Sequence, residues 1–136
     1  MNRYRIILVE NDEDEQMFMR EGFESSGLFD IVAQVDNGDV LLNYLEEHKN
    51  NLPDIILSDL NMPGKNGMDI IEEVTSNPEY KHIPVIITST SSTRSIIDKC
   101  LAAGAIDYVV KPDTFIDYLP FVQDLHRRIE QRSILK

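Results

Sequence analysis

Short apolar runs alternate with longer segments of helical pattern along this chain. Runs rich in Ile and Val lie at residues 5–9, 31–35, 55–57, 85–87 and 108–110. Continuous apolar runs of this length are typical of strands buried on both faces of a sheet. Between them, apolar residues recur at helical spacing, most clearly from Phe115 to Ile129. The alternation predicts an α/β fold, a doubly wound five-stranded parallel sheet with helices on both faces.

The last helical segment contains a proline, Pro120. In the interior of a helix a proline removes a hydrogen bond and clashes with the preceding turn. The first turn tolerates it, because the first amides of a helix have no partner within the helix. We therefore predict that Asp117 caps this helix and that Tyr118 begins it.

Composition narrows the class of protein. A chain of 136 residues is the size of one domain, and we expect residues 1–136 to form that domain without an output domain. Thirteen Lys and Arg against 24 Asp and Glu give a net charge of −11, which repels nucleic-acid phosphates and anionic membranes. The chain has no long apolar run, and its lone cysteine suits a reducing compartment. We expect a cytoplasmic protein that binds neither nucleic acid nor membranes.

Polar side chains follow four of the predicted strands. They are Glu10 to Glu13 after the first strand, Asp59 and Asn61 after the third, Thr88 to Thr90 after the fourth, and Lys111 with Pro112 after the fifth. In an open parallel sheet the ligand site lies beyond the carboxyl ends of the strands. Carboxylate and carbonyl oxygens suit Mg²⁺, while a Lys ammonium and hydroxyls suit phosphoryl oxygens. The pattern therefore favours a site for Mg²⁺ and a phosphoryl group.

These strand ends resemble those of the receiver domains of two-component response regulators. The resemblance rests on ordered motifs at residues 7–12, 58–64 with Gly67, 84–89 and 108–112, and it covers essentially the whole chain. It implies a flavodoxin-like sheet with strand order 2-1-3-4-5. It also implies that a histidine kinase or a histidine phosphotransfer protein donates a phosphoryl group, with Mg²⁺ as cofactor. The implied protein is not an enzyme beyond this self-phosphorylation and slow hydrolysis of its own acyl phosphate.

Under this resemblance each motif residue has an expected role. Asp59 is the expected phosphoacceptor. The expected Mg²⁺ ligands are Glu10, Asn11, Asp59 and the backbone carbonyl of Asn61. The residues expected to contact the phosphoryl group or to report it are Ser89, Thr90, Tyr108 and Lys111, and the peptide bond before Pro112 is expected to be cis. Receivers of this kind often pair through the fourth helix, fifth strand and fifth helix, so we also expect a homodimer.

One residue departs from the family pattern. Response regulators usually carry two acidic residues in a row at the end of the first strand, and here the pair is Glu10 and Asn11. Because an amide oxygen carries no charge, we expect weaker Mg²⁺ binding. Asp12 and Asp14 follow a strand and precede a helix, which favours a capping role over metal binding.

Other functions stay open at this point. The neutral Asn11 motivates a receiver that binds partners in one fixed state, without phosphorylation. A phosphohydrolase with an aspartyl-phosphate intermediate needs a second acid at residue 61, where this chain has Asn. A flavin-binding module needs a phosphate-binding loop after the first strand, and this chain has no such Ser-, Thr- and Gly-rich loop there. The three histidines lack the spacing of zinc ligands, and Cys100 has the spacing of a core residue.

Overall fold

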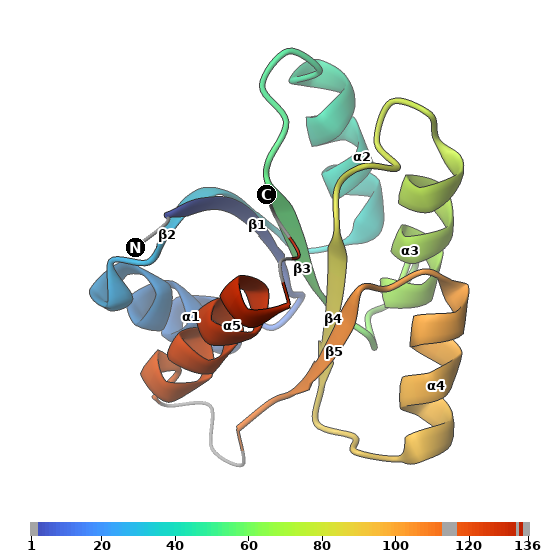
Figure 1. Cartoon of the computed structure of the whole chain (residues 1–136). Coiled ribbons are helices and arrows are strands. Elements are labelled where there is room, and N and C mark those ends of the chain that lie inside the picture. The colour runs from blue at the N-terminus through green and yellow to red at the C-terminus, as the bar shows by residue number, and fades with distance from the viewer. Residues whose placement is uncertain (1–2, 113–116, 133, 135–136) are drawn as a thin grey trace.

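The computed structural model of the chain describes residues 3–112, 117–132 and 134. These residues form a sheet of five parallel strands in the order β2-β1-β3-β4-β5 (Figure 1). The strands are β1 (Tyr4–Val9), β2 (Phe29–Val35), β3 (Ile55–Asp59), β4 (Val85–Ser89) and β5 (Asp107–Val110). The helices are α1 (Glu13–Ser26), α2 (Gly38–Glu47), α3 (Gly67–Ser76), α4 (Arg94–Ala103) and α5 (Leu119–Gln131). The predicted fold class and strand order are confirmed.

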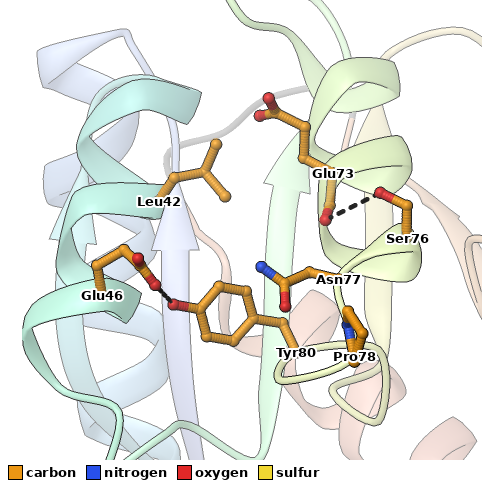
Figure 2. A pocket seen from close by; sticks show the side chains of 7 residues that line it. All are labelled: Leu42, Glu46, Glu73, Ser76, Asn77, Pro78 and Tyr80. Carbon is orange, nitrogen blue, oxygen red and sulfur yellow. Dashed lines mark hydrogen bonds between the residues drawn. The ribbon is translucent and has the colours of Figure 1, made fainter.

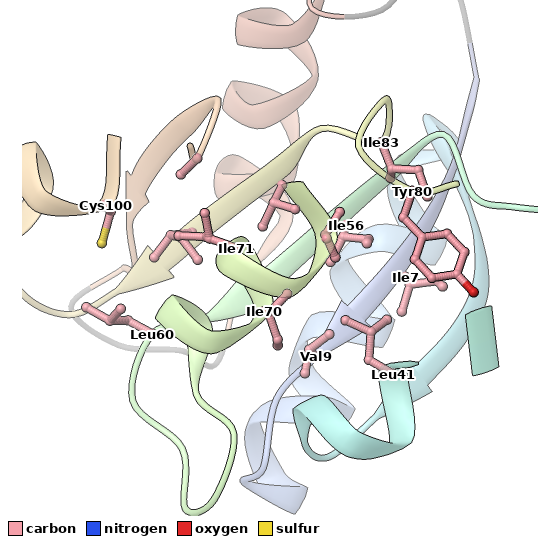
Figure 3. Close-up of a cluster of buried hydrophobic side chains, with 14 of the residues drawn as sticks. Ile7, Val9, Leu41, Ile56, Leu60, Ile70, Ile71, Tyr80, Ile83 and Cys100 are labelled. Atoms are coloured by element: carbon pink, nitrogen blue, oxygen red, sulfur yellow. The ribbon is translucent and has the colours of Figure 1, made fainter. Parts of the chain in front are cut away.

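Helices cover both faces of the sheet, α1 and α5 on one face and α2, α3 and α4 on the other (Figure 1). Successive residues of β1 supply the two cores alternately. Ile7 and Val9 pack with α2 and α3 (Figure 3), while Ile6 and Leu8 pack with α1 and α5. Each such buried side chain contributes about 1.5–3 kcal/mol. Cys100 lies in the first of these cores, as its spacing predicts.

The register of β1 and β3 brings the expected site residues together. Ile6 lies opposite Ile55, and the pairing continues to Val9 opposite Ser58. The residues that follow these last two, Glu10 and Asp59, therefore lie side by side at the carboxyl edge of the sheet. The strand order also reverses here, because β1 lies between β2 and β3. This is the position at which an open α/β sheet forms its ligand site.

The start of α5 lies one residue later than the sequence predicts. Tyr118 is the N-cap and Leu119 the first helical residue, while the Leu119 N–H donates to the Asp117 carboxylate at 3.0 Å. Pro120 falls in the first turn, where its missing N–H breaks no hydrogen bond. Among the described helices, none is long and apolar enough to span a bilayer.

Candidate functional site

Three charged side chains predicted from the strand ends meet at the carboxyl edge of the sheet. Lys111 Nζ lies 3.0 Å from Glu10 Oε1 and 3.1 Å from Asp59 Oδ1. All three residues are buried, with exposed fractions of 2% for Glu10, 6% for Asp59 and 9% for Lys111. Gly67 packs behind Asp59, where an added Cβ would lie 2.8 Å from the Asp59 carbonyl oxygen. A glycine is therefore required where α3 approaches the end of β3.

A fourth charged residue, Glu15 of α1, joins this cluster and was not predicted. Its Oε2 atom lies 2.6 Å from Lys111 Nζ, the shortest of the three carboxylate contacts. Glu15 is 7% exposed. Its position three residues after Asp12 reads as part of a helix cap, and the Asp12 carboxylate does accept from the Glu15 N–H at 2.9 Å. The predicted capping role of Asp12 is confirmed, whereas the Glu15 side chain turns into the site.

The cluster holds more negative than positive charge, and the pKa values respond to it. Burial, the neighbouring Glu15 carboxyl and the charge of Asp59 raise the pKa of Glu10 to about 8, against the opposing pull of Lys111. Burial also raises the pKa of Asp59, again opposed by Lys111. Burial disfavours the charged form of Lys111, but hydrogen bonds and charge from the three carboxylates outweigh it and raise the pKa of the ammonium. The Lys111 ammonium therefore stays charged among three carboxyl groups.

The hydroxyl groups of Ser89, at the end of β4, and of Tyr108 in β5 both bond to the same backbone segment. Ser89 is buried, and its Oγ accepts from the Ser91 N–H at 3.2 Å. The Tyr108 hydroxyl donates to the Ser91 carbonyl oxygen at 2.8 Å. Both side chains are therefore held by the same residue of the connection between β4 and α4. Thr90 lies between Ser89 and Ser91 in sequence and is exposed.

The two asparagines of the expected metal site lie outside the buried cluster. Asn11 directly follows Glu10, and Asn61 lies two residues after Asp59, so both belong to the same edge of the sheet. Both are exposed.

The expectation for Pro112 is wrong. Among the described residues there is no cis peptide bond, so the bond between Lys111 and Pro112 is trans. Trans is the intrinsically preferred isomer even before proline. With the trans bond, Lys111 still reaches all three carboxylates.

The donor set suits a divalent cation in its chemistry. Glu10, Glu15 and Asp59 offer buried carboxylate oxygens in excess over the single ammonium, and a hard cation prefers oxygen ligands. The arrangement is built around Lys111, however, whose Nζ lies within 3.1 Å of all three carboxylates. No group of three His, Cys, Asp or Glu in the described part of the chain is placed to hold a metal ion. The residues therefore fit a cation by charge and donor type, while their ligand geometry is not preformed.

A groove of about 500 Å³ lies away from this edge, between α2, α3 and the segment that leads to β4 (Figure 2). Its lining includes Leu42, Glu73 and Pro78. The Tyr80 hydroxyl donates to the Glu46 carboxylate there (Figure 2). Tyr80 is 2% exposed, so this is a buried tyrosine that has the acidic partner its hydroxyl requires.

A comparison with known protein families identifies the family of this chain. The family of response regulator receiver domains matches residues 6–119. The chain belongs to this family. Its relatives include the transcriptional regulatory protein PdtaR of Mycobacterium tuberculosis, 27% identical over 132 residues, which are 97% of this chain and 61% of that protein.

Other relatives are much longer than this chain. The two-component response regulator-like protein PRR73 of rice is 31% identical over 108 residues, which cover 79% of this chain and 14% of that protein. The chain thus spans a small part of this plant relative. Among solved structures, the phosphorylated cyanobacterial phytochrome response regulator RcpA matches with a TM-score of 0.80 and 27% identity, over 98% of this chain and 97% of that one. The Mn²⁺-bound response regulator Rcp1 matches with a TM-score of 0.69 and 25% identity, over 96% and 94%.

Proposed function

We propose that this receiver domain accepts a phosphoryl group on Asp59 from a histidine kinase or a histidine phosphotransfer protein and then changes an interaction surface. The observation that carries the proposal is the buried Asp59 carboxylate at the end of β3, with Lys111 Nζ 3.1 Å away and Glu10 beside it. Burial and the raised pKa of Asp59 set this carboxyl apart from the exposed acids of the chain. The phosphorylated state of the relative RcpA supports the same reaction here.

Phosphoryl transfer to Asp59 needs a nucleophile and neutralisation of charge. A carboxylate oxygen of Asp59 bonds to phosphorus while the bond from phosphorus to the donor's imidazole nitrogen breaks, and the donor histidine keeps the bonding electrons. Lys111, already within 3.1 Å of Asp59, neutralises charge on the transferred oxygens. A bound divalent cation supplies further neutralisation. Glu10, Asp59 and the Asn61 carbonyl would hold it, with Asn11 adding a neutral oxygen.

The divalent cation belongs to the proposal as well. The Mn²⁺-bound form of the relative Rcp1 supports the binding of a divalent cation, and the surplus of carboxylates over ammonium groups favours this edge of the sheet by charge. We propose Mg²⁺ as the cation because the expected ligands are all oxygen atoms.

The hydroxyl contacts offer a route from Asp59 to a protein surface. In the unphosphorylated chain the Ser89 hydroxyl accepts a hydrogen bond from the Ser91 N–H. A phosphoryl group on Asp59 attracts this hydroxyl. Because Tyr108 is bonded to the same Ser91, a shift of this residue changes the position of the Tyr108 ring on β5. Tyr108 also lines a groove of about 450 Å³ over α4, β5 and α5.

This groove is the surface we propose for a second copy of the chain. Leu101 and Val110 are exposed apolar side chains of the groove, 39% and 41% exposed. The arginines of α5 are used within the face, since Arg128 and Arg132 both pair with Asp107 at 3.2 Å. The face thus combines apolar surface with charges that can exchange partners, which suits a protein interface better than a nucleic-acid site.

A second candidate is a receiver that acts in one fixed state. It is favoured by the neutral, exposed Asn11 and by Lys111, which is already engaged by three carboxylates. In this case Asp59 is a structural acid and the interaction face does not respond to phosphodonors.

One experiment separates the two candidates. The chain is incubated with acetyl phosphate and Mg²⁺, and its intact mass is measured before and after treatment with base. Our proposal expects one acid-stable, base-labile phosphoryl group on the wild type and none on Asp59→Asn. Asp36→Asn is the matched control, because Asp36 follows β2 at the same edge of the sheet but is exposed, and it should be modified like the wild type. An unmodified wild type, or a phosphoryl group on another residue, would favour the fixed receiver.

A further inference from the structure

A buried tyrosine hydroxyl at the start of α5 has no hydrogen-bond partner. Tyr118 is 1% exposed, and its hydroxyl is the one buried side-chain polar atom without a partner among the described residues. The residue is held firmly. A Cβ added to Gly22 of α1 would lie 2.6 Å from Tyr118 Cβ, and the Phe121 ring packs edge-on against the tyrosine with centroids 5.3 Å apart. Burying a hydroxyl without a partner costs solvation free energy that no bond returns, so its position calls for an explanation.

The Tyr118 side chain packs on the face of α1 that carries Glu15, because Gly22, which contacts Tyr118, lies seven residues, or about two helical turns, after Glu15. Burial raises the pKa of the Tyr118 hydroxyl, and the negative charges of Glu15, Glu10 and Asp59, together with the close approach of the Glu15 carboxyl, raise it further. Of the three acids, Glu15 acts most strongly on the hydroxyl. The unpartnered hydroxyl thus lies beside a carboxylate that is bonded to Lys111 instead. By contrast, the hydroxyl of the buried Tyr80 is bonded to its nearby acid, Glu46.

The Lys111 ammonium is engaged by three carboxylates. An ammonium carries three N–H donors, and its Nζ lies within 3.1 Å of Glu10, Glu15 and Asp59. A phosphoryl group on Asp59 adds more than one negative charge and three acceptor oxygens next to it. Lys111 donates hydrogen bonds to Glu10 and Glu15, so a second bond from Lys111 to the phosphoryl group, beyond its contact with Asp59, requires it to give up one of these two carboxylates. Glu15 comes from α1 and not from a strand end, so it is the partner that can be released without moving the sheet.

We propose that Glu15 and Tyr118 are positioning residues of the phosphoacceptor site, in which Glu15 holds Lys111 before phosphorylation and is passed to the Tyr118 hydroxyl when Lys111 turns to the phosphoryl group. This inference rests on the proposed function of Asp59. The exchange leaves neither the buried carboxylate nor the hydroxyl without a partner. Because Tyr118 is the N-cap of α5, it also connects the phosphoacceptor site to the helix that borders the interaction face.

The test compares the free chain with the chain bound to beryllofluoride, a mimic of the phosphoryl group, in the presence of Mg²⁺. Amide NMR titration gives the apparent Kd of wild type, Tyr118→Phe, Glu15→Met and the double variant. Tyr118→Phe should weaken beryllofluoride binding about tenfold, or about 1.4 kcal/mol, because Glu15 then loses its second partner. In the Glu15→Met background the same tyrosine substitution should change Kd by less than about twofold. Tyr80→Phe removes a buried hydroxyl away from the site and should leave Kd unchanged.

Urea unfolding of the free chain supplies a readout that separates exchange from a structural role. In the free protein the Tyr118 hydroxyl makes no bond, so Tyr118→Phe should leave the unfolding midpoint unchanged or raise it. A purely structural tyrosine would lower the midpoint and would weaken binding equally with or without Glu15.

Each outcome decides a separate point. If the wild type binds no beryllofluoride, the proposed function fails and this inference fails with it. If the wild type binds but Tyr118→Phe matches it within about twofold, only the exchange is overturned. Equal weakening in both backgrounds also overturns it, since the tyrosine then acts without Glu15. Should Glu15→Met not fold, Tyr118→Phe still decides through its Kd and its unfolding midpoint.

Discussion

Helices α1 and α3 begin in nearly the same way and use their first acids differently. Each follows the carboxyl end of a strand and has a polar N-cap, Asp12 or Asn66, whose side chain accepts from the amide three residues later, at 2.9 Å and 3.1 Å. Each also has an acid at that third position. In α3, the Asp69 carboxylate accepts a hydrogen bond from the Asn66 N–H at 3.0 Å, which completes a capping box. In α1, Glu15 binds Lys111 at 2.6 Å instead.

Two features of the surroundings account for the difference. The Asp12 N–H already donates to Glu10 Oε2 at 3.1 Å, so the N-cap amide of α1 does not need Glu15. A buried cation also lies within reach of Glu15, whereas the cation near the start of α3, Lys65, is 34% exposed and pairs with other surface acids. The same local motif therefore caps a helix or builds a site according to the charge that the fold places beside it.

Removing the cation at each helix start should give the largest effect. Lys111→Met leaves three buried carboxylates without a counter-charge, and loss of one partner from a buried ion pair costs about 3–5 kcal/mol. We expect a loss of about 3 kcal/mol in the free energy of unfolding at pH 7.5, since protonation of the acids relieves part of the cost. Lys65→Met should cost less than about 1 kcal/mol because its partners are exposed.

Urea unfolding curves of both lysine variants check this. Equal losses would mean that the cluster at Lys111 is as well solvated as a surface ion pair. The contrast between the two helix starts would then have no energetic basis.

The fold could be predicted because its strands carry their own signal. β1 and β4 are buried on both faces and read as continuous apolar runs, so their existence and alternation with helices are visible in the sequence. Strand ends are less visible. β3 and β4 extend two residues beyond their apolar runs, to Asp59 and Ser89. Both residues are polar but buried, so a search for apolar runs ends each strand too early.

The site could be predicted only where it consists of strand ends. Glu10, Asp59 and Lys111 follow strands, and parallel topology brings them to one edge. Glu15 was missed because its spacing from the N-cap matches a capping box, which is the role that the corresponding acid, Asp69, has in α3. Tyr118 was missed because its aromatic ring fits the apolar period of the last helix, and its hydroxyl carries no periodic signal.

The second prediction is that the free energy of unfolding depends on pH through the acids at the start of α1 and not through those at the start of α3. The pKa of Glu10 is about 8 in the folded chain, above its ordinary value of 4.5, so between these values the folded chain binds more protons than the unfolded chain. The stability that this group supplies is complete below about pH 4.5 and is lost as pH rises through about 8. The slope is at most about 1.4 kcal/mol per pH unit for one proton.

Urea unfolding between pH 5 and pH 9 in the presence of EDTA measures the slope. Glu10→Gln should flatten it, and Asp69→Asn at the start of α3 should leave it as in the wild type. A wild-type stability that is constant over this range would contradict the raised pKa of Glu10.

The third prediction uses matched asparagines at the two helix starts. Asn11→Asp adds a carboxylate at the carboxyl end of β1, next to Glu10, and should tighten Mg²⁺ binding about tenfold, or about 1.4 kcal/mol. The added repulsion should lower the stability of the metal-free chain slightly. Asn66→Asp adds the same charge at the N-cap of α3 and should leave Mg²⁺ affinity unchanged. Calorimetric titration of the three proteins decides the point, and equal affinities would mean that another acid, such as Glu15, already supplies the charge.

The smallest effects should come from the caps themselves. Asp12→Ala and Asn66→Ala each remove one side-chain acceptor from an amide at the third helical position, and each should lower the free energy of unfolding by about 1 kcal/mol. The costs should be equal, because neither substitution removes a backbone N–H and Asp69 can still accept from residue 66. Thermal unfolding of the two variants measures the difference. A clearly larger loss for Asn66→Ala would show that the two bonds of the capping box stabilise each other. Helix α1 would then be less stable than α3 at its start, because Glu15 binds Lys111 and not the N-cap amide.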